Sequence, residues 1–454
     1  MRPVPCAHGP TRSGAGLGAR DMTTPEPISP IEADRALAGL EAYDRLIVAV
    51  SGGADSTALL HLLVEFAARS GLPPSRLLAV TVNHRLRPES AAEAMRVAAA
   101  AAALGVPHLT KTYDGPLPTA PFAQAWARDL RYRLLAEAAR DGLIPGTTAA
   151  ILTAHHQDDQ AETLLMRLAR GSGIDGLAGI RRRRVLATGV DLIRPLLGFP
   201  KDRLLASLIA RGAAWIDDPS NTNQRFERVR LRARTTARAD LGLTTPALAL
   251  AAGRAGRASL ALGALTDRFL ASAGVMVHPL GWVWLDWPAL LQEPDEIRLR
   301  ALATIIASVG GQGPPSLGDL EALTVETGWS NPAGKTFGHC SFLAGAGAAV
   351  DIVREPGRGQ PAPQPIDPGE AIVWDGRYRI RSGPQVPAGA ELRWLTADGR
   401  AQALAVGGTA PSIPKAAILT LPSVWQGTAL LAAPAIGIGT ELLEIEPFRL
   451  RSQS

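Results

Sequence analysis

The 454-residue sequence predicts an α/β catalytic domain built on a parallel sheet, followed by a helical domain and a β-rich C-terminal domain. Strand-like and helix-like segments alternate from residue 44 to about 214, which is the pattern of βαβ units. After residue 232 helical segments with few charges follow, and then short apolar runs separated by Gly and Pro. We therefore expect a tail at 1–30, a catalytic domain at 31–232, a helical domain at 233–328 and a β-rich domain at 329–454.

Composition favours a globular protein of the cytoplasm. Hydrophobic residues make up 46% of the chain, and no apolar run approaches the ~20 residues that span a bilayer. The two cysteines, Cys6 and Cys340, exclude a disulfide framework and a thiolate-bound metal cluster. The first thirty residues lack an apolar segment, so we expect a disordered tail rather than a secretory signal, with Met22 as an alternative start. The net charge of +5 suits a nucleic-acid partner, although a bias towards arginine can also come from genome composition.

Polar residues follow the strands of the expected sheet. In a parallel sheet, ligands bind beyond the carboxyl ends of the strands. Ser51 follows the first expected strand, Asn83 and His84 end the second, and His155 ends the fourth. These residues are therefore expected at one edge of the sheet. The expected strands are 45–50, 77–84, 108–113, 150–155 and 192–197.

A glycine turn after the first strand predicts a phosphate site. Two adjacent glycines let the backbone approach a ligand, and N–H groups at a helix N-terminus favour an anion. A carboxylate beside a phosphate is repelled unless a divalent cation lies between them, so Asp55 indicates Mg²⁺. In the alternative, Asp55 and Ser56 merely cap the helix. The candidate phosphate-binding residues are Ser51, Gly52, Gly53, Ala54, Asp55 and Ser56.

An acidic segment, TAHHQDDQAET at 153–163, follows the fourth strand. His155, Asp158, Asp159 and Glu162 share one face of a helix that starts near His155. Carboxylates and an imidazole are costly to concentrate unless they bind a cation or manage protons, so these four residues are catalytic candidates. The alternative is a solvated helix face with aspartates at its N-terminus.

These motifs resemble a known family. The segment 51–56 resembles the pyrophosphatase loop, or PP-loop, of enzymes that split ATP between its α and β phosphates. Paired with 153–173, it is similar to the tRNA(Ile)-lysidine synthetases. This chain departs from the family at two positions. Asn83 stands where the family usually has Asp, and Val229 stands where Asn is frequent. Further matches, in the family's order, are VDHxLR at 82–87, ARxxRY at 127–132, an RPLL strand at 194–197, and DPSN with RF at 217–226.

The resemblance implies a PP-loop (adenine nucleotide α-hydrolase-like) fold and an ATP-dependent ligase. The implied substrate is tRNA(Ile) with a CAU anticodon, whose wobble cytidine is adenylated at the C2 oxygen. Free L-lysine then displaces AMP and gives lysidine. A homodimer is implied by the resemblance alone.

The resemblance also implies roles for individual residues. Asp55 and Asp159 share Mg²⁺, and Asp158, Glu162 or His155 accepts the proton of the attacking lysine. The implied tRNA-binding residues are Arg128, Arg131, Arg194, Arg225, Arg228 and Arg232. Three alternatives stay open: another adenylating synthetase, a cytidine thiolase, and a nucleotide-gated RNA-binding protein without chemistry.

Overall fold

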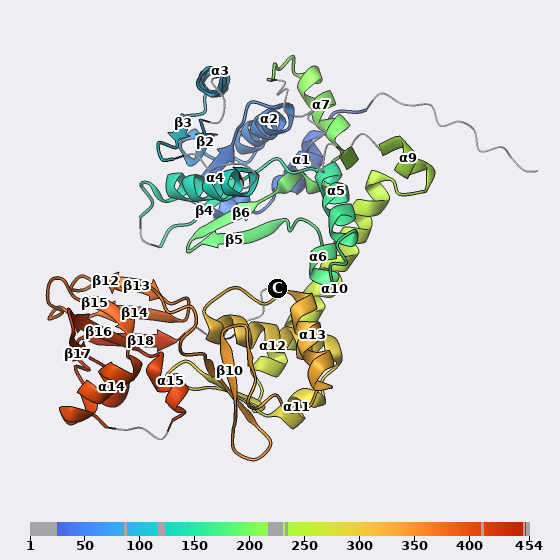
Figure 1. Ribbon diagram of the computed structural model, residues 1–454. Helices are drawn as coiled ribbons and strands as arrows, with labels where there is room; N and C mark the ends of the chain where they lie inside the picture. Colours follow the sequence, from blue (N-terminus) through green and yellow to red (C-terminus); the bar gives the residue numbers. More distant parts are fainter. Residues whose placement is uncertain are drawn as a thin grey trace, which may run out of the picture. The chain divides into compact units, whose positions relative to one another are not determined.

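The computed structural model describes residues 25–85, 89–116, 123–144, 146–216, 230–231, 235–409, 413–447 and 450. The chain forms two compact units. Unit 1 contains Met1–Met166 and Gly179–Ala252, and unit 2 contains Arg167–Ala178 and Gly253–Ser454. Figure 1 shows that both helices and strands contribute to each unit. None of the described helices is long and apolar enough to cross a membrane.

Unit 1 is built on a six-stranded sheet of order β3-β2-β1-β4-β6-β5. Neighbouring strands are parallel except for β5, which is antiparallel to β6. The parallel sheet expected from the sequence is thus confirmed, and β5 is an additional strand. The strands are β1 (Arg45–Ala49), β2 (Leu77–Asn83), β3 (His108–Thr112), β4 (Ala149–Leu152), β5 (Arg183–Ala187) and β6 (Val190–Ile193).

The strand expected at 192–197 is wrong in its second half. Strand β6 ends at Ile193, and Pro195–Gly198 form a short 3-10 helix, η3. Proline has no N–H to donate to a strand ladder, and its φ is fixed near the helical value. The RPLL motif is therefore a turn at the end of the strand.

Helices cover both faces of the sheet (Figure 1). On β1, Leu46 and Val48 join the core under α1, α2 and α7, whereas Ile47 joins the core under α4. Such strands are apolar throughout because both faces are buried. The helices of unit 1 are α1 (Pro30–Leu37), α2 (Ala54–Arg69), α3 (Ser90–Ala103), α4 (Ala123–Arg140), α5 (Gln157–Leu168), α7 (Lys201–Ala210) and α9 (Thr235–Asp240), with 3-10 turns η1 (Leu40–Ala42) and η2 (Pro74–Arg76).

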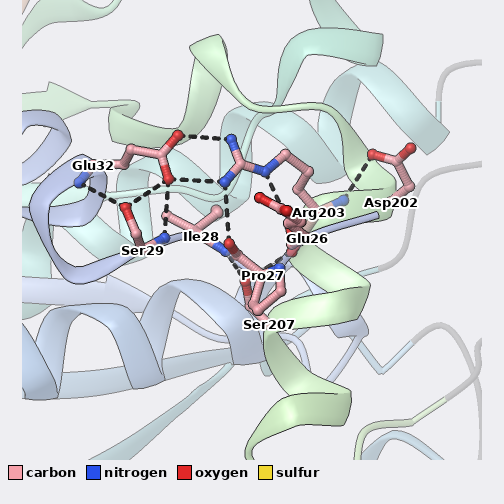
Figure 2. Close-up of polar contacts among 8 residues, drawn as sticks. All are labelled: Glu26, Pro27, Ile28, Ser29, Glu32, Asp202, Arg203 and Ser207. Atoms are coloured by element: carbon pink, nitrogen blue, oxygen red, sulfur yellow. Dashed lines mark hydrogen bonds and ion pairs between the residues drawn. The ribbon is translucent and has the colours of Figure 1, made fainter. Parts of the chain in front are cut away.

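A polar clamp fastens the start of the described chain to α7 (Figure 2). The Arg203 guanidinium donates to both carboxylate oxygens of Glu32 at 2.8 Å and to the carbonyl oxygens of Glu26 and Pro27. The N–H of Ile28 donates to Ser207 Oγ at 2.8 Å. The last residues of the expected tail, 25–30, are therefore ordered, because they satisfy their polar groups on α7.

Unit 2 contains three antiparallel sheets. The first has the order β7-β8-β11-β10-β9, the second β12-β15-β16-β17 and the third β13-β14-β18. Its helices are α6 (Ile174–Leu177), α10 (Thr245–Leu270, whose first residues belong to unit 1), α11 (Trp287–Leu291), α12 (Asp295–Gly310), α13 (Leu317–Thr327), α14 (Thr396–Ala405) and α15 (Lys415–Leu419), with the 3-10 turn η5 (Pro434–Ile436).

The β-rich C-terminal region predicted from the sequence is confirmed. The domain boundaries stay predictions, although the first sheet takes strands from both sides of residue 328. The strands of unit 2 are β7 (Val275–Val277), β8 (Val283–Leu285), β9 (Thr336–Phe337), β10 (Cys340–Ala344), β11 (Val350–Arg354), β12 (Gln364–Pro365), β13 (Ala371–Trp374), β14 (Tyr378–Ser382), β15 (Glu391–Trp394), β16 (Pro422–Gln426), β17 (Ala429–Ala432) and β18 (Leu443–Pro447).

Candidate nucleotide site

The glycine turn between β1 and α2 requires glycine at position 52. Gly52 has a φ of 86°, in the left-handed region, and a Cβ there would lie 2.6 Å from Ile216 Cδ1. The N–H of Ile216 also donates to the Gly52 carbonyl oxygen at 2.8 Å, so the chain that follows α7 closes over the turn. This close approach fixes the backbone that opens α2.

The N-cap position of α2 has no side chain to cap the helix. Its N-cap residue is Gly53, which makes no side-chain cap hydrogen bond. Ser56 Oγ instead donates to the Gly53 carbonyl oxygen at 3.0 Å and accepts from the Ser51 N–H at 3.2 Å. Asp55 and Ser56 thus lie within the first turn of α2, and the N-cap position itself is Gly53. The N–H groups of the first turn, together with the helix dipole, are arranged to bind an anion.

A buried imidazole joins the glycine turn to the acidic segment. His156 Nε2 lies 3.6 Å from Asp55 Oδ2 and 3.6 Å from Asp159 Oδ2, and its Nδ1 lies 3.5 Å from Asp158 Oδ2. The His156 side chain is only 2% exposed. The structure thus brings Asp55, Asp158 and Asp159 around one ring.

The charges of this cluster compensate one another. Burial alone would lower the pKa of His156, but the carboxylates of Asp158, Asp55 and Asp159 outweigh it and raise that pKa to about 10. Burial likewise raises the pKa of Asp158, yet hydrogen bonds from His156 and from the Lys201 N–H hold it at about 2. At neutral pH the cluster is therefore an imidazolium among carboxylates.

The N-terminus of α7 supplies a second cation. The Lys201 N–H donates to Asp158 Oδ2 at 2.9 Å, and Lys201 Nζ lies 3.8 Å from Asp55 Oδ2. Sequence reasoning missed both Lys201 and the contact role of His156. A signal for Lys201 was present, because it is one of only four lysines in the chain and lies four positions after the end of the RPLL motif.

The helix of the acidic segment begins later than expected. Helix α5 starts at Gln157, so His155 precedes it and does not share its face, which corrects the spacing argument. His155 Nδ1 instead lies 3.0 Å from Thr153 Oγ1. Glu162 is on α5 and is 1% exposed.

The arginines expected to bind tRNA occupy different places. Arg128 and Arg131 are exposed on α4. Arg194 is 3% exposed and donates through Nη1 to the Arg181 carbonyl oxygen at 2.7 Å. Asn83 Oδ1 accepts from the Arg85 N–H at 2.9 Å, which gives this departure from the family a role in the turn. Arg225, Arg228 and Arg232, with the DPSN and RF segment, lie outside the described residues.

This fold and this placement of a glycine turn are those of a nucleotide-binding domain of the PP-loop class, and the PP-loop domain model matches residues 29–239. The similarity to individual proteins extends further along the chain. A tRNA(Ile)-lysidine synthase of Ruegeria pomeroyi is 40% identical over 396 residues, which are 87% of this chain and 89% of the relative. The chain therefore belongs to the tRNA(Ile)-lysidine synthase family.

Two further members of the family give the same result. The tRNA(Ile)-lysidine synthase of Rhodopseudomonas palustris is 44% identical over 306 residues, which are 66% of this chain and 85% of the relative. That of Bradyrhizobium sp. is 43% identical over 353 residues, which are 74% of this chain and 95% of the relative. The alternatives of another adenylating synthetase and of a cytidine thiolase are thereby set aside.

Proposed function

We propose that this protein joins L-lysine to the wobble cytidine of a tRNA(Ile) that carries a CAU anticodon. In the first step the C2 oxygen of the cytidine attacks the α-phosphorus of ATP, and pyrophosphate leaves. In the second step an amino group of lysine attacks C2, and AMP leaves with the oxygen. The observation that carries the proposal is the likeness to named tRNA(Ile)-lysidine synthases over most of the chain.

The phosphates of ATP are proposed to lie on the glycine turn. The N-terminus of α2, whose N-cap residue is Gly53, presents N–H groups to them, and Gly52 supplies the positive φ that the turn requires. Lys201, with a side chain that is 39% exposed beside Asp55, is placed to add a positive charge. These groups would stabilise the negative charge that develops on the departing pyrophosphate.

The carboxylates of Asp55 and Asp159 fit a magnesium ion that arrives with ATP. Both approach His156 Nε2 to 3.6 Å, so they face a common point. Within the described residues, no group of three His, Cys, Asp or Glu side chains is placed to hold a metal. Mg²⁺ commonly binds through one or two carboxylates and the phosphates of the substrate, so two carboxylates suffice. When bound, Mg²⁺ would neutralise charge on the phosphates.

An attacking lysine must lose a proton, and the structure favours some acceptors over others. Asp158 is held by the His156 ring and the Lys201 N–H, and its pKa of about 2 makes it a weak base. Glu162, buried on α5, and His155, beside Thr153, therefore remain the better candidates. We further propose a cytoplasmic location, where tRNA and ATP are available, and a homodimer on the basis of the family resemblance.

Incorporation of labelled lysine into RNA tests the proposed function. With ATP and a CAU-anticodon tRNA(Ile) transcript, we expect acid-stable label in the tRNA, and none when ATP is omitted. Exchange of pyrophosphate into ATP should require the same tRNA. Binding of tRNA without exchange would instead support the alternative, an RNA-binding protein without chemistry.

A further inference from the structure

A hollow of about 400 Å³ lies on unit 1 between α4 and β5. Four arginines line it: Arg128, Arg133 and Arg140 from α4, and Arg184 from β5. The two acidic residues that line it are Asp129 and Glu137. The buried Tyr132 and Ala136 also line it, so the wall it shares with α4 is rigid.

The described part of the chain does not neutralise these four guanidiniums. They are exposed, and none makes an ion pair with any residue that the structure describes, Asp129 and Glu137 included. The neighbouring Arg183 on β5 behaves differently, since its Nη2 lies 2.7 Å from Asp191 Oδ2. Because side chains alternate along a strand, Arg183 and Arg184 point to opposite faces. The unpaired charges therefore gather on the face that carries the hollow.

A buried arginine, Arg194, feels the charges of two of these cations. Burial is the main reason that its pKa lies below its ordinary value; Tyr132 opposes this shift, and the charges of Arg128 and Arg184 add to it. Arg194 Nε is buried and has no hydrogen-bond partner among the described residues. Like charges that line one hollow are unfavourable unless an anion joins them.

The hollow runs from the catalytic edge of the sheet towards the opposite edge. Near its start, the carbonyl oxygen of Ala127 lies 2.9 Å from Nε2 of His84, which follows the carboxyl end of β2. At its far end, Arg140 precedes Asp141, whose carbonyl oxygen accepts a hydrogen bond from Arg45 at the amino end of β1. From Arg128 to Arg140 the helix rises about 18 Å, which is long enough for several nucleotides.

We propose that this basic hollow binds the sugar-phosphate backbone of the tRNA next to the nucleotide that is modified. Arg133, Arg140 and Arg184 would contact phosphates, and Arg128 would continue the row to the catalytic edge. Arginine suits phosphate because its planar fork can bind two oxygens. Such contacts position the RNA without reading its sequence. The inference deepens the proposed function and rests on it.

Salt dependence of tRNA binding tests this inference. The variant is Arg133→Gln/Arg140→Gln, and the matched control is Arg35→Gln/Arg96→Gln, which changes two exposed helical arginines that have no described ion pair. The Kd of an unmodified CAU-anticodon tRNA(Ile) transcript is measured over a range of NaCl concentrations. The log of the association constant falls as the log of the salt concentration rises, and each phosphate contact adds about 0.7–0.9 to the steepness of this line. We expect the line to be less steep by about 1.5 for the variant, which loses two contacts. It should keep the wild-type steepness for the control.

Two further measurements separate charge from fold and the inference from the function. Arg133→Lys/Arg140→Lys should restore the slope, because it keeps the two charges. Pyrophosphate exchange that depends on tRNA should match the wild type in the control Arg35→Gln/Arg96→Gln. If the slope of the glutamine variant is unchanged and the wild type still modifies the tRNA, the inference is wrong and the proposed function stands. A wild type that neither binds nor adenylates the tRNA would overturn the proposed function instead.

Discussion

The buried ring of His156 shows how two distant segments become one site. Its two nitrogens lie within 3.6 Å of carboxylates from α2 and from the start of α5. Removing one partner from such a group leaves uncompensated charge, which is strongly unfavourable when buried. The ring therefore holds the carboxylates in place before any nucleotide is bound.

At the residue scale, Asp55→Asn is expected to abolish adenylation. The amide keeps the shape of the side chain but loses the charge that faces His156, Lys201 and the proposed cation. Affinity for tRNA should stay nearly unchanged, because the arginines proposed to bind the RNA lie on α4 and β5. Pyrophosphate exchange and tRNA binding are the two measurements. Exchange at the wild-type rate would remove Asp55 from the proposed site.

Lys201→Met should weaken the use of ATP. The substitution removes the proposed hydrogen bond from the Lys201 ammonium to a phosphate of ATP. A charge-assisted hydrogen bond of this kind contributes about 1.5–3 kcal/mol, so kcat/KM for ATP should fall about 10- to 150-fold. Lys111→Met is the control, because its ion pair with Asp141 is on the surface of unit 1. Steady-state kinetics of the two variants give the comparison. Equal effects of both substitutions would contradict a role for Lys201 at the phosphates.

Several of these residues could not be identified from the sequence. Asp55, Asp158 and Asp159 belong to sequence motifs, so they could be named as candidate site residues from the sequence alone. His156 and Lys201 act through contacts that exist only after β4 and η3 have placed them. Choosing between His155 and His156 needs the start of α5, and a helix boundary is uncertain from sequence by several residues.

At the scale of elements, α1 is fastened at its first turn. Ser29 and Glu32 form a capping box, and Glu32 also accepts two hydrogen bonds from Arg203 on α7. The same helix α7 presents Lys201 to the carboxylates. The clamp of Figure 2 thus fixes the element that carries a residue of the proposed site.

Glu32→Gln should lower stability in a pH-dependent way. Hydrogen bonds from Arg203 and Ser29 lower the pKa of Glu32 to about 2 from an ordinary value of 4.5. Because the pKa of Glu32 is lower in the folded protein than in the unfolded chain, its carboxylate stabilises the folded state at pH values above about 4.5. This stabilisation is lost as the pH falls from about 4.5 towards 2. Because the pair is partly exposed, we expect a loss of about 1 kcal/mol at pH 7.

Urea unfolding at pH 7 and at pH 3.5 measures this difference. It should shrink at the lower pH, because the unfolded wild-type chain takes up a proton at Glu32 below about pH 4.5, whereas the folded carboxylate, with its pKa of about 2, stays ionised. Glu89→Gln serves as the control, because Glu89 is exposed and makes no side-chain cap hydrogen bond. A difference that grows at low pH would contradict the assignment.

Predictions of individual elements succeeded where burial dictated the pattern. Strands β1, β2 and β4 are apolar because both faces are covered, and β13 and β14 alternate as a half-buried sheet does. Strand β5 was not foreseen, because Arg183 and Arg184 are exposed and suggest a loop. Its pairing with β6 depends on tertiary contacts that no local pattern reports.

At the scale of the whole molecule, each unit has its own core. In unit 2, Leu302 on α12 is 1% exposed and packs among β8, β10 and β11. Leu302→Ala should destabilise this unit by about 2–5 kcal/mol, because it removes buried methyl groups and leaves a cavity. Hydrogen exchange should show the loss at α12 amides while β1 amides of unit 1 keep their protection.

Val325→Ala is the control for this substitution. Val325 is 81% exposed on α13, so the change should stay within about 0.5 kcal/mol. An equal loss of protection in α12 and β1 after Leu302→Ala would mean that the two units unfold together.

Unit 1 is interrupted in the chain, and this has a consequence for inheritance. The polypeptide leaves it after Met166, gives residues 167–178 to unit 2, returns at Gly179 and leaves again after Ala252. A gene fragment ending at codon 252 would encode Asp175 without Arg300, whose Nη2 lies 2.9 Å from its carboxylate. A fragment cut at that point would therefore split this ion pair of unit 2, and we expect the two units to be inherited together.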